Sequence, residues 1–148
     1  MRTAAIADAQ SPAAKWRARA MFLIRKFVIG YRITGEPHFD REATACFKSL
    51  LARSSRYLEY GSGGSTILAW QSANVVVTVD NDRRFLRALT RTLLQSARKP
   101  DLFRLIHADT GITLRWGVPV FRTPTPARLS RWQHYAKAPW EFLRAPRR

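Results

Sequence analysis

The hydrophobic pattern changes its period along the chain and predicts a series of helices and strands. From Ala13 to Ile29, apolar residues recur every three or four positions with basic residues between them, which is typical of a basic amphipathic helix. The apolar positions are Trp16, Ala20, Leu23 and Phe27, and the basic ones are Arg17, Arg19, Arg25 and Lys26. Gly30 and the Gly35-Glu36-Pro37 turn end this segment, residues 13–35. Residues 1–12 show no period, and we expect a flexible tail there.

A second helix is expected after Asp40, because an aspartate can accept hydrogen bonds from the unpaired N–H groups at a helix start. Its apolar stripe would consist of Ala43, Phe47, Leu50 and Leu51. The Ser54-Ser55 pair ends the stripe. The chain therefore begins with two helices.

The period then shortens, and three segments become strand candidates: Arg56–Tyr60, Val75–Val79 and Leu102–His107. The β-branched run Val75–Val79 is typical of a strand buried on both faces. A short helix at Ser65–Ser72 and a longer one opened by Asp82 separate the strands. This alternation predicts the α/β class: a Rossmann-like, three-layer fold with a parallel sheet, preceded by two helices.

Beyond Asp109 the pattern predicts little regular structure. Pro119, Pro124 and Pro126 lack a backbone N–H and interrupt helices and strands, so we expect a loop with one helical turn within residues 128–135. Trp116, Trp132, Tyr135 and Trp140 supply apolar anchors for that loop.

Composition sets the size and class of the protein. With 148 residues, 46% of them hydrophobic, the chain fits one folded domain and lies outside the composition of disordered proteins. The single cysteine, Cys46, excludes an internal disulfide and a multi-cysteine metal site, and its apolar helical surroundings predict a buried side chain. We expect no metal site. No secretory signal is evident, so we expect a cytoplasmic protein that is peripheral to a membrane if the first helix binds there.

The net charge of +16 leaves two interpretations open for the basic N-terminal helix. A strongly basic chain suggests a polyanionic partner, either nucleic acid or an anionic membrane surface. The arginines, however, are spread over the whole chain without one dominant block, which favours a helix packed on its own domain. The helix is too short and too charged to span a bilayer.

Residues suited to ligand chemistry follow each predicted strand. The first group is Glu59-Tyr60-Gly61-Ser62-Gly63-Gly64, a glycine-rich turn between a strand and a helix, where Gly61 and Gly63 allow unusual backbone angles and a close ligand. The spacing departs from the dinucleotide fingerprint, and no Gly-Lys-Ser/Thr follows as in a P-loop. An acid at Glu59 suits a cationic ligand group better than a phosphate.

The segment Tyr57-Leu58-Glu59-Tyr60-Gly61-Ser62-Gly63-Gly64-Ser65-Thr66 resembles the first motif of class I S-adenosylmethionine-dependent methyltransferases, in the form found in bacterial methyltransferase-like proteins. The resemblance implies that Glu59 contacts the methionine amine of the cofactor, directly or through water. It also implies that Gly61 and Gly63 let the cofactor lie against the backbone, with Ser62 adding backbone contacts.

Two further acids extend this assignment. Asp80 directly follows the valine-rich strand, about 20 residues beyond the glycine turn, where a carboxylate binds the ribose hydroxyls in nucleoside-binding Rossmann folds. Asp109 follows the third strand, where the resemblance implies an acid near the adenine amino group. Taken singly, the glycines, Asp80 and Asp109 are also explained as ordinary turn and capping residues. His107 has no evident partner and receives no catalytic role.

The resemblance extends from about Asp40 to Trp140, and it implies further strands that this sequence does not contain. We therefore expect the N-terminal half only of the methyltransferase-like fold, apparently truncated after the third strand, with residues 36–148 forming a partial cofactor-binding domain. Catalytic residues would lie mostly in the missing half, and none is named. The missing strands would pair with the first strand, so Tyr57–Tyr60 is expected at an edge of the sheet. The alternative function is a non-catalytic basic module that binds nucleic acid or an anionic membrane.

Overall fold

The three segments predicted as strands form one parallel sheet in the computed structural model, which describes residues 11–24, 26 and 30–144. The strands are β1 (Arg56–Tyr60), β2 (Val75–Asp80) and β3 (Leu102–His107), in the order β1-β2-β3. Glu59 is paired in register with Thr78, and Asp80 with His107, so the strands end at the same edge of the sheet. β1 lies at one side of the sheet, as expected.

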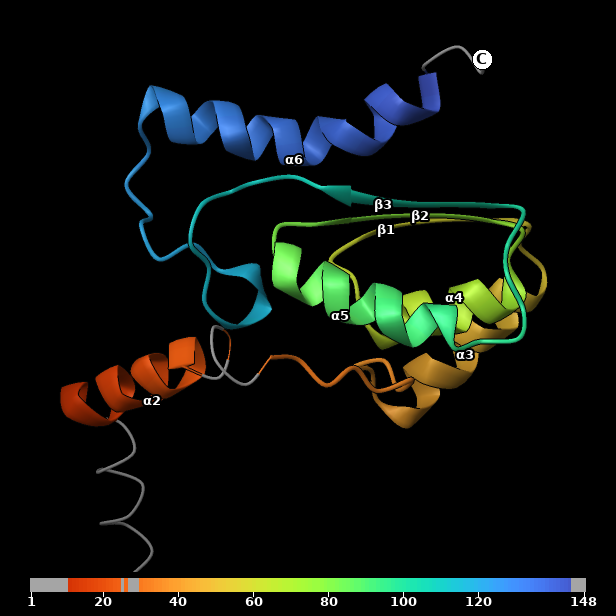
Figure 1. Ribbon diagram of the computed structural model, residues 1–148, viewed down its shortest axis with the longest axis horizontal. Coiled ribbons are helices and arrows are strands. Elements are labelled where there is room, and N and C mark those ends of the chain that lie inside the picture. The colour runs from red at the N-terminus through yellow and green to blue at the C-terminus, as the bar shows by residue number, and fades with distance from the viewer. Residues whose placement is uncertain (1–10, 25, 27–29, 145–148) are drawn as a thin grey trace, which may run out of the picture.

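The central strand β2 is buried on both faces of the sheet. Val76, Val77, Thr78 and Val79 of β2 are all buried. The crossover helices α4 (Gly64–Ser72) and α5 (Arg83–Leu94) cover one face together with α3 (Arg41–Ala52) (Figure 1). Both crossovers move the chain by one strand in the same direction, which places both helices on the same face.

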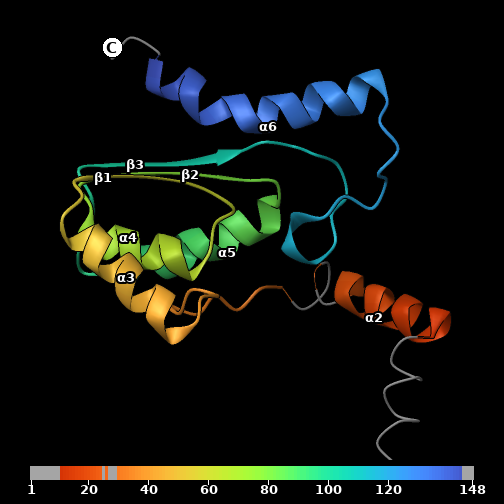
Figure 2. The same ribbon diagram turned by 180° about the vertical axis from the view of Figure 1, so that it is seen from behind.

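The other face is covered by α6 (Pro126–Arg144), which completes three layers (Figure 2). The predicted loop with one helical turn is wrong here, since α6 has 19 residues. Pro126 is the first helical residue, where a missing N–H costs nothing. Pro139 lies inside the helix and is buried, next to Ala138, which packs on Val79 of β2. Burial against the sheet therefore compensates for the helix-breaking proline.

The two N-terminal helices were predicted, but their surroundings differ from the expectation. α2 (Pro12–Ile24) covers residues 13–24 of the expected 13–29 helix. Residues 25 and 27–29 of that prediction, which include Phe27, and residues 1–10 of the predicted tail lie outside the described residues. Trp16, assigned to the packing stripe, is 68% exposed. Phe22 instead lines a shallow cavity with Leu114 and Val118. In α3, Cys46 is exposed and not buried.

Candidate functional site

The glycine-rich turn leaves β1 and enters α4 at the edge where the strands end. Gly61 has φ +84, a left-handed conformation that favours glycine, and its N–H donates to the Val79 carbonyl at 2.8 Å. The Gly63 N–H donates to Thr66 Oγ1 at 2.9 Å. A Cβ at Gly61 or Gly63 would meet no atom within 4 Å. The turn therefore leaves its backbone accessible to a ligand.

Gly64 was not singled out from the sequence, yet it is the most constrained glycine of the turn. A Cβ there would lie 2.2 Å from the Glu36 carbonyl oxygen. The Glu36-Pro37 backbone packs directly on this first residue of α4. Gly64 is thus required for packing, whereas Gly61 and Gly63 are suited to ligand approach.

Glu59 is buried beneath the turn, and hydroxyl groups surround its carboxylate. It accepts hydrogen bonds from the hydroxyls of Tyr57 at 2.8 Å, Ser65 at 2.7 Å and Thr66. Burial raises the pKa of this carboxyl, and the hydroxyl donors only partly oppose the effect. In this arrangement Glu59 fixes the turn to the start of α4, and its contact with a cofactor amine stays a prediction.

Asp80 joins the glycine turn to the start of α5. Its Oδ2 accepts from the Ser62 N–H at 2.8 Å, and its Oδ1 accepts from the Asp82 N–H at 2.8 Å. Burial raises the pKa of Asp80, against the effect of these backbone donors. The predicted backbone donor of Ser62 is therefore engaged within the protein, but each carboxylate oxygen of Asp80 keeps a further acceptor position.

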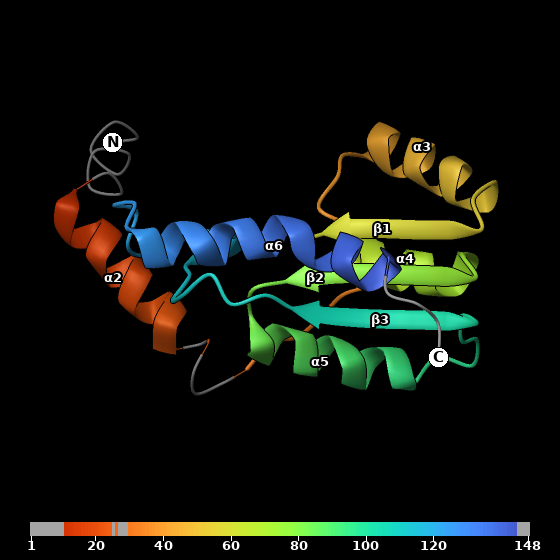
Figure 3. The same ribbon diagram turned by 90° about the horizontal axis from the view of Figure 1, so that it is seen from above.

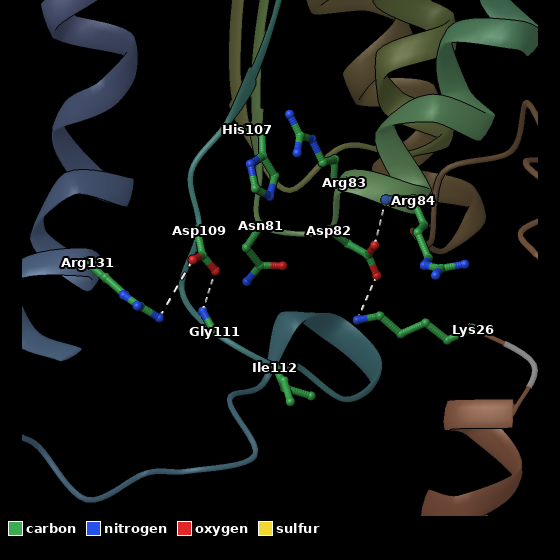
Figure 4. A pocket seen from close by; sticks show the side chains of 10 residues that line it. All are labelled: Lys26, Asn81, Asp82, Arg83, Arg84, His107, Asp109, Gly111, Ile112 and Arg131. Atoms are coloured by element: carbon green, nitrogen blue, oxygen red, sulfur yellow. Dashed lines mark hydrogen bonds and ion pairs between the residues drawn. The ribbon is translucent and has the colours of Figure 1, made fainter. Parts of the chain in front are cut away.

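A cavity of about 370 Å³ lies beside this turn, between the residues that follow β2 and β3 (Figure 4). Asn81 and Asp82 come from the end of β2, and His107 and Asp109 from the end of β3. Its basic lining residues are Lys26, Arg83, Arg84 and Arg131. The turn residues Glu59, Gly61, Ser62 and Gly63, and also Asp80, are not among the lining residues. The predicted site therefore has two adjacent parts, linked by the chain at positions 80–82.

Asp109 is the one predicted site residue that lines the cavity, and it is exposed. Its Oδ1 accepts from the Gly111 N–H at 2.8 Å, and its Oδ2 lies 3.6 Å from Arg131 Nη1 of α6. Exposed ion pairs of this kind contribute little stability. Asp109 is therefore available to a ligand in the cavity.

Lys26 forms the opposite wall of the cavity, and sequence reasoning missed it by grouping it with the arginines of the first helix. Its Nζ lies 2.8 Å from Asp82 Oδ2 and donates to Thr113 O at 3.1 Å and to Thr113 Oγ1 at 3.2 Å. Tyr31 donates to the same Asp82 oxygen at 2.6 Å. Burial opposes ionisation of Asp82, but hydrogen bonds from Lys26 and Tyr31 outweigh it and lower the pKa. This buried ion pair ties the N-terminal segment to the site.

Tyr135 of α6 covers the glycine turn from the other face of the sheet. Its ring packs on Tyr60, with centroids 5.7 Å apart, and on the cluster around Val79. Burial and the Asp80 carboxylate raise the pKa of its phenol to about 12, although the backbone of Gly61 partly opposes this. The sequence indicated Tyr135 only as an apolar anchor of the expected loop.

The described part of the chain holds neither a candidate metal site nor a candidate membrane span. No group of three or more His, Cys, Asp and Glu side chains there could hold a metal ion. None of the helices described there is long and apolar enough to cross a bilayer.

Comparison with known proteins gives one informative match. No protein-family model matches the chain, and no curated protein does. Among solved structures, the chain is similar to a methyltransferase-like protein from Silicibacter pomeroyi, with 26% sequence identity and a TM-score of 0.61 over 72% of this chain. The match covers 54% of that protein, so the chain spans about half its length. The three parallel strands with their flanking helices thus form a Rossmann-like, methyltransferase-like fold.

Proposed function

We propose that this chain binds S-adenosylmethionine at the edge where β1, β2 and β3 end, as a methyltransferase-like protein. The observation that carries the proposal is Asp80, which holds the glycine turn through Ser62 N–H and the start of α5 through Asp82 N–H. It therefore lies between the turn and the cavity. A carboxylate in this position suits the ribose hydroxyls of a nucleoside.

The side chains present suit a ligand of this size and charge. The cavity is open to solvent, and its volume of about 370 Å³ is of the size of small-molecule sites. Its lining carries four basic side chains and two carboxylates, and the carboxylates pair with Lys26 and Arg131. The remaining excess of positive charge disfavours a sulfonium or an ammonium group, so the uncharged adenine belongs in the cavity, near Asp109. The cationic methionine end then belongs over Gly61 and Gly63, where the backbone is accessible.

The chain's part in the chemistry would be binding and orientation. S-adenosylmethionine, when bound, supplies a methyl group that its own sulfonium activates, so no strong acid or base is required. Asp80 would hold the ribose, Asp109 would accept from the adenine amino group, and Glu59 would keep the glycine turn in shape. No residue is assigned to the methyl transfer itself, and the methyl acceptor is left open.

Isothermal titration with S-adenosylhomocysteine, the demethylated product, tests the proposal. We expect saturable heat for the wild-type chain and a loss of about tenfold to a hundredfold in affinity for Asp80→Asn, since a charged hydrogen-bond acceptor is removed. Asp101→Asn is the matched control, because Asp101 is an exposed acid at the opposite end of β3. It should bind like the wild type.

A second variant separates a lost contact from a lost fold. A Cβ at Gly63 would meet no protein atom within 4 Å, so Gly63→Ala should fold normally yet place a methyl group where a ligand would lie on the turn. Circular dichroism would verify folding of each variant. Absence of heat with folded wild-type protein, or equal affinities for Asp80→Asn and Asp101→Asn, would refute the proposal.

A further inference from the structure

Three large apolar side chains of α2 are exposed in the described part of the chain. Trp16 is 68% exposed, Met21 60% and Ile24 51%. Figures 1 and 3 place α2 beside the segment after β3, at the end of the molecule opposite α3. An exposed tryptophan and two other large apolar side chains on one short helix are typical of a binding surface.

Trp16 and Ile24 share one side of the helix. Ala18 and Phe22, four residues apart, line the cavity against Leu114 and Val118 and so mark the inward side. Trp16, Ala20 and Ile24 are also four residues apart, and at 100° per residue Ala20 lies about 200° from Ala18. Trp16, Ala20 and Ile24 therefore form a stripe on the outward side, and all three are exposed. We call it the outer stripe of α2.

Two arginines flank this stripe, Arg17 on one side and Arg19 on the other. Both are exposed, α2 contains no acidic residue, and Arg19 also reaches the cavity on the inward side. The Arg19 guanidinium lies over the Trp16 ring, 5.5 Å from its centroid. An apolar stripe between cationic side chains is the pattern of helices that lie in the interface of an anionic bilayer.

We propose that α2 docks on an anionic lipid surface through its outer stripe, with Arg17 and Arg19 at the level of the headgroups. Charge argues against a second copy of this chain as the occupant, because two chains of net charge +16 repel each other. Nucleic acid would use the arginines, but its phosphates offer nothing to Ile24. A bilayer surface uses both kinds of side chain, because its hydrocarbon buries the apolar ones and its anionic headgroups bind the cationic ones.

The docking helix is connected to the cofactor site. Lys26 follows α2 by two positions and is buried against Asp82 in the cavity wall. Ile112 lines the same cavity and is itself exposed, on the segment that packs beside α2. A bilayer bound to α2 would therefore lie near the end of the molecule where the strands end.

Vesicle flotation with the full-length protein tests this surface. The probes are vesicles of phosphatidylcholine alone and vesicles that also contain phosphatidylglycerol. We expect binding only to the anionic vesicles, and weaker binding when salt rises from about 0.05 M to about 0.5 M, because the Debye length shrinks. Binding should also shift tryptophan fluorescence to the blue, and Trp16→Phe should lose most of this shift.

Two substitutions by aspartate test whether the outer stripe is responsible for vesicle binding. Ile24→Asp should weaken vesicle binding by about tenfold or more, since it removes buried apolar area and adds a repelled charge. Leu94→Asp is the matched control, because Leu94 is 62% exposed on α5, and it should change binding by no more than about fivefold through its charge. Equal losses in both variants, or no binding to anionic vesicles, would overturn the proposal. So would tighter binding to duplex DNA that Ile24→Asp leaves unchanged.

Discussion

Replacing Lys26 by methionine should destabilise the protein more than any other single loss of a lysine. Lys26 is 7% exposed, and its partner Asp82 is 12% exposed. Removing one member of a buried ion pair typically costs about 3–5 kcal/mol, because the other charge stays buried without compensation. Asp82 is partly exposed and keeps the Tyr31 hydroxyl and two backbone donors, so we expect a smaller loss, about 2–3 kcal/mol.

The effect should depend on pH in a defined direction. The folded-state pKa of Asp82 lies below its ordinary value of 3.8, so the ionised carboxylate contributes stability above that pH. This stability is lost as pH falls through the folded-state pKa. Lys26→Met removes a donor that lowers the pKa of Asp82. The loss in free energy of unfolding relative to the wild type should therefore be largest near neutral pH and should shrink in acid.

Urea unfolding followed by circular dichroism at about pH 7 and about pH 3 measures both effects. Lys48→Met is the control, because Lys48 is exposed on α3, and it should change the free energy of unfolding by no more than about 0.5 kcal/mol. If Lys26→Met is as stable as Lys48→Met at neutral pH, the buried ion pair does not hold the N-terminal segment in place, and the reasoning fails.

Four further variants probe the glycine turn and Tyr135, which packs beside it, by urea or thermal unfolding. Gly64→Ala should cost about 3 kcal/mol, since its Cβ would meet the Glu36 backbone, whereas Gly63→Ala should stay within about 0.5 kcal/mol of the wild type. The raised pKa of Glu59 makes its ionisation destabilising as pH rises from 4.5 through the folded-state value, so Glu59→Gln should flatten this part of the stability profile. Tyr135→Phe keeps the ring contacts and should cost about 1 kcal/mol or less, and a larger loss would mean that the hydroxyl matters more than the packing.

Local signals in the sequence were sufficient for the sheet and its crossover helices. Asp40 caps α3 by accepting from the Ala43 N–H at 2.7 Å, and Asp82 caps α5, because capping depends on residues three positions apart at most. The run of valines in β2 predicted correctly that this strand is buried. These features need no knowledge of the rest of the fold.

Features created by distant contacts were missed. α6 was predicted as a loop because its prolines oppose a helix locally, while the packing of Ala138 on Val79 and Ala108 exists only in the folded protein. Lys26 is buried by Asp82 and by Thr113, which is 87 residues away in the sequence. No periodicity marks such a pair in advance.

The candidate site was predicted in its location but not in its details. Glu59, Asp80 and Asp109 follow or end successive strands at one edge of the sheet, as their sequence positions implied. The hydroxyl shell around Glu59 and the use of the Ser62 N–H by Asp80 depend on side-chain directions that a sequence does not give. Because Glu59 and the Ser62 N–H are already engaged within the protein, we assign the main ligand-binding role to Asp80.

A crystal structure of the chain with S-adenosylhomocysteine would test the central claim most directly. We expect electron density for the ribose within hydrogen-bonding distance of the Asp80 carboxylate, with the adenine in the cavity beside Asp109 and the amino-acid end over Gly61 and Gly63. A ligand bound elsewhere on the molecule, or one whose ribose makes no contact with Asp80, would contradict it.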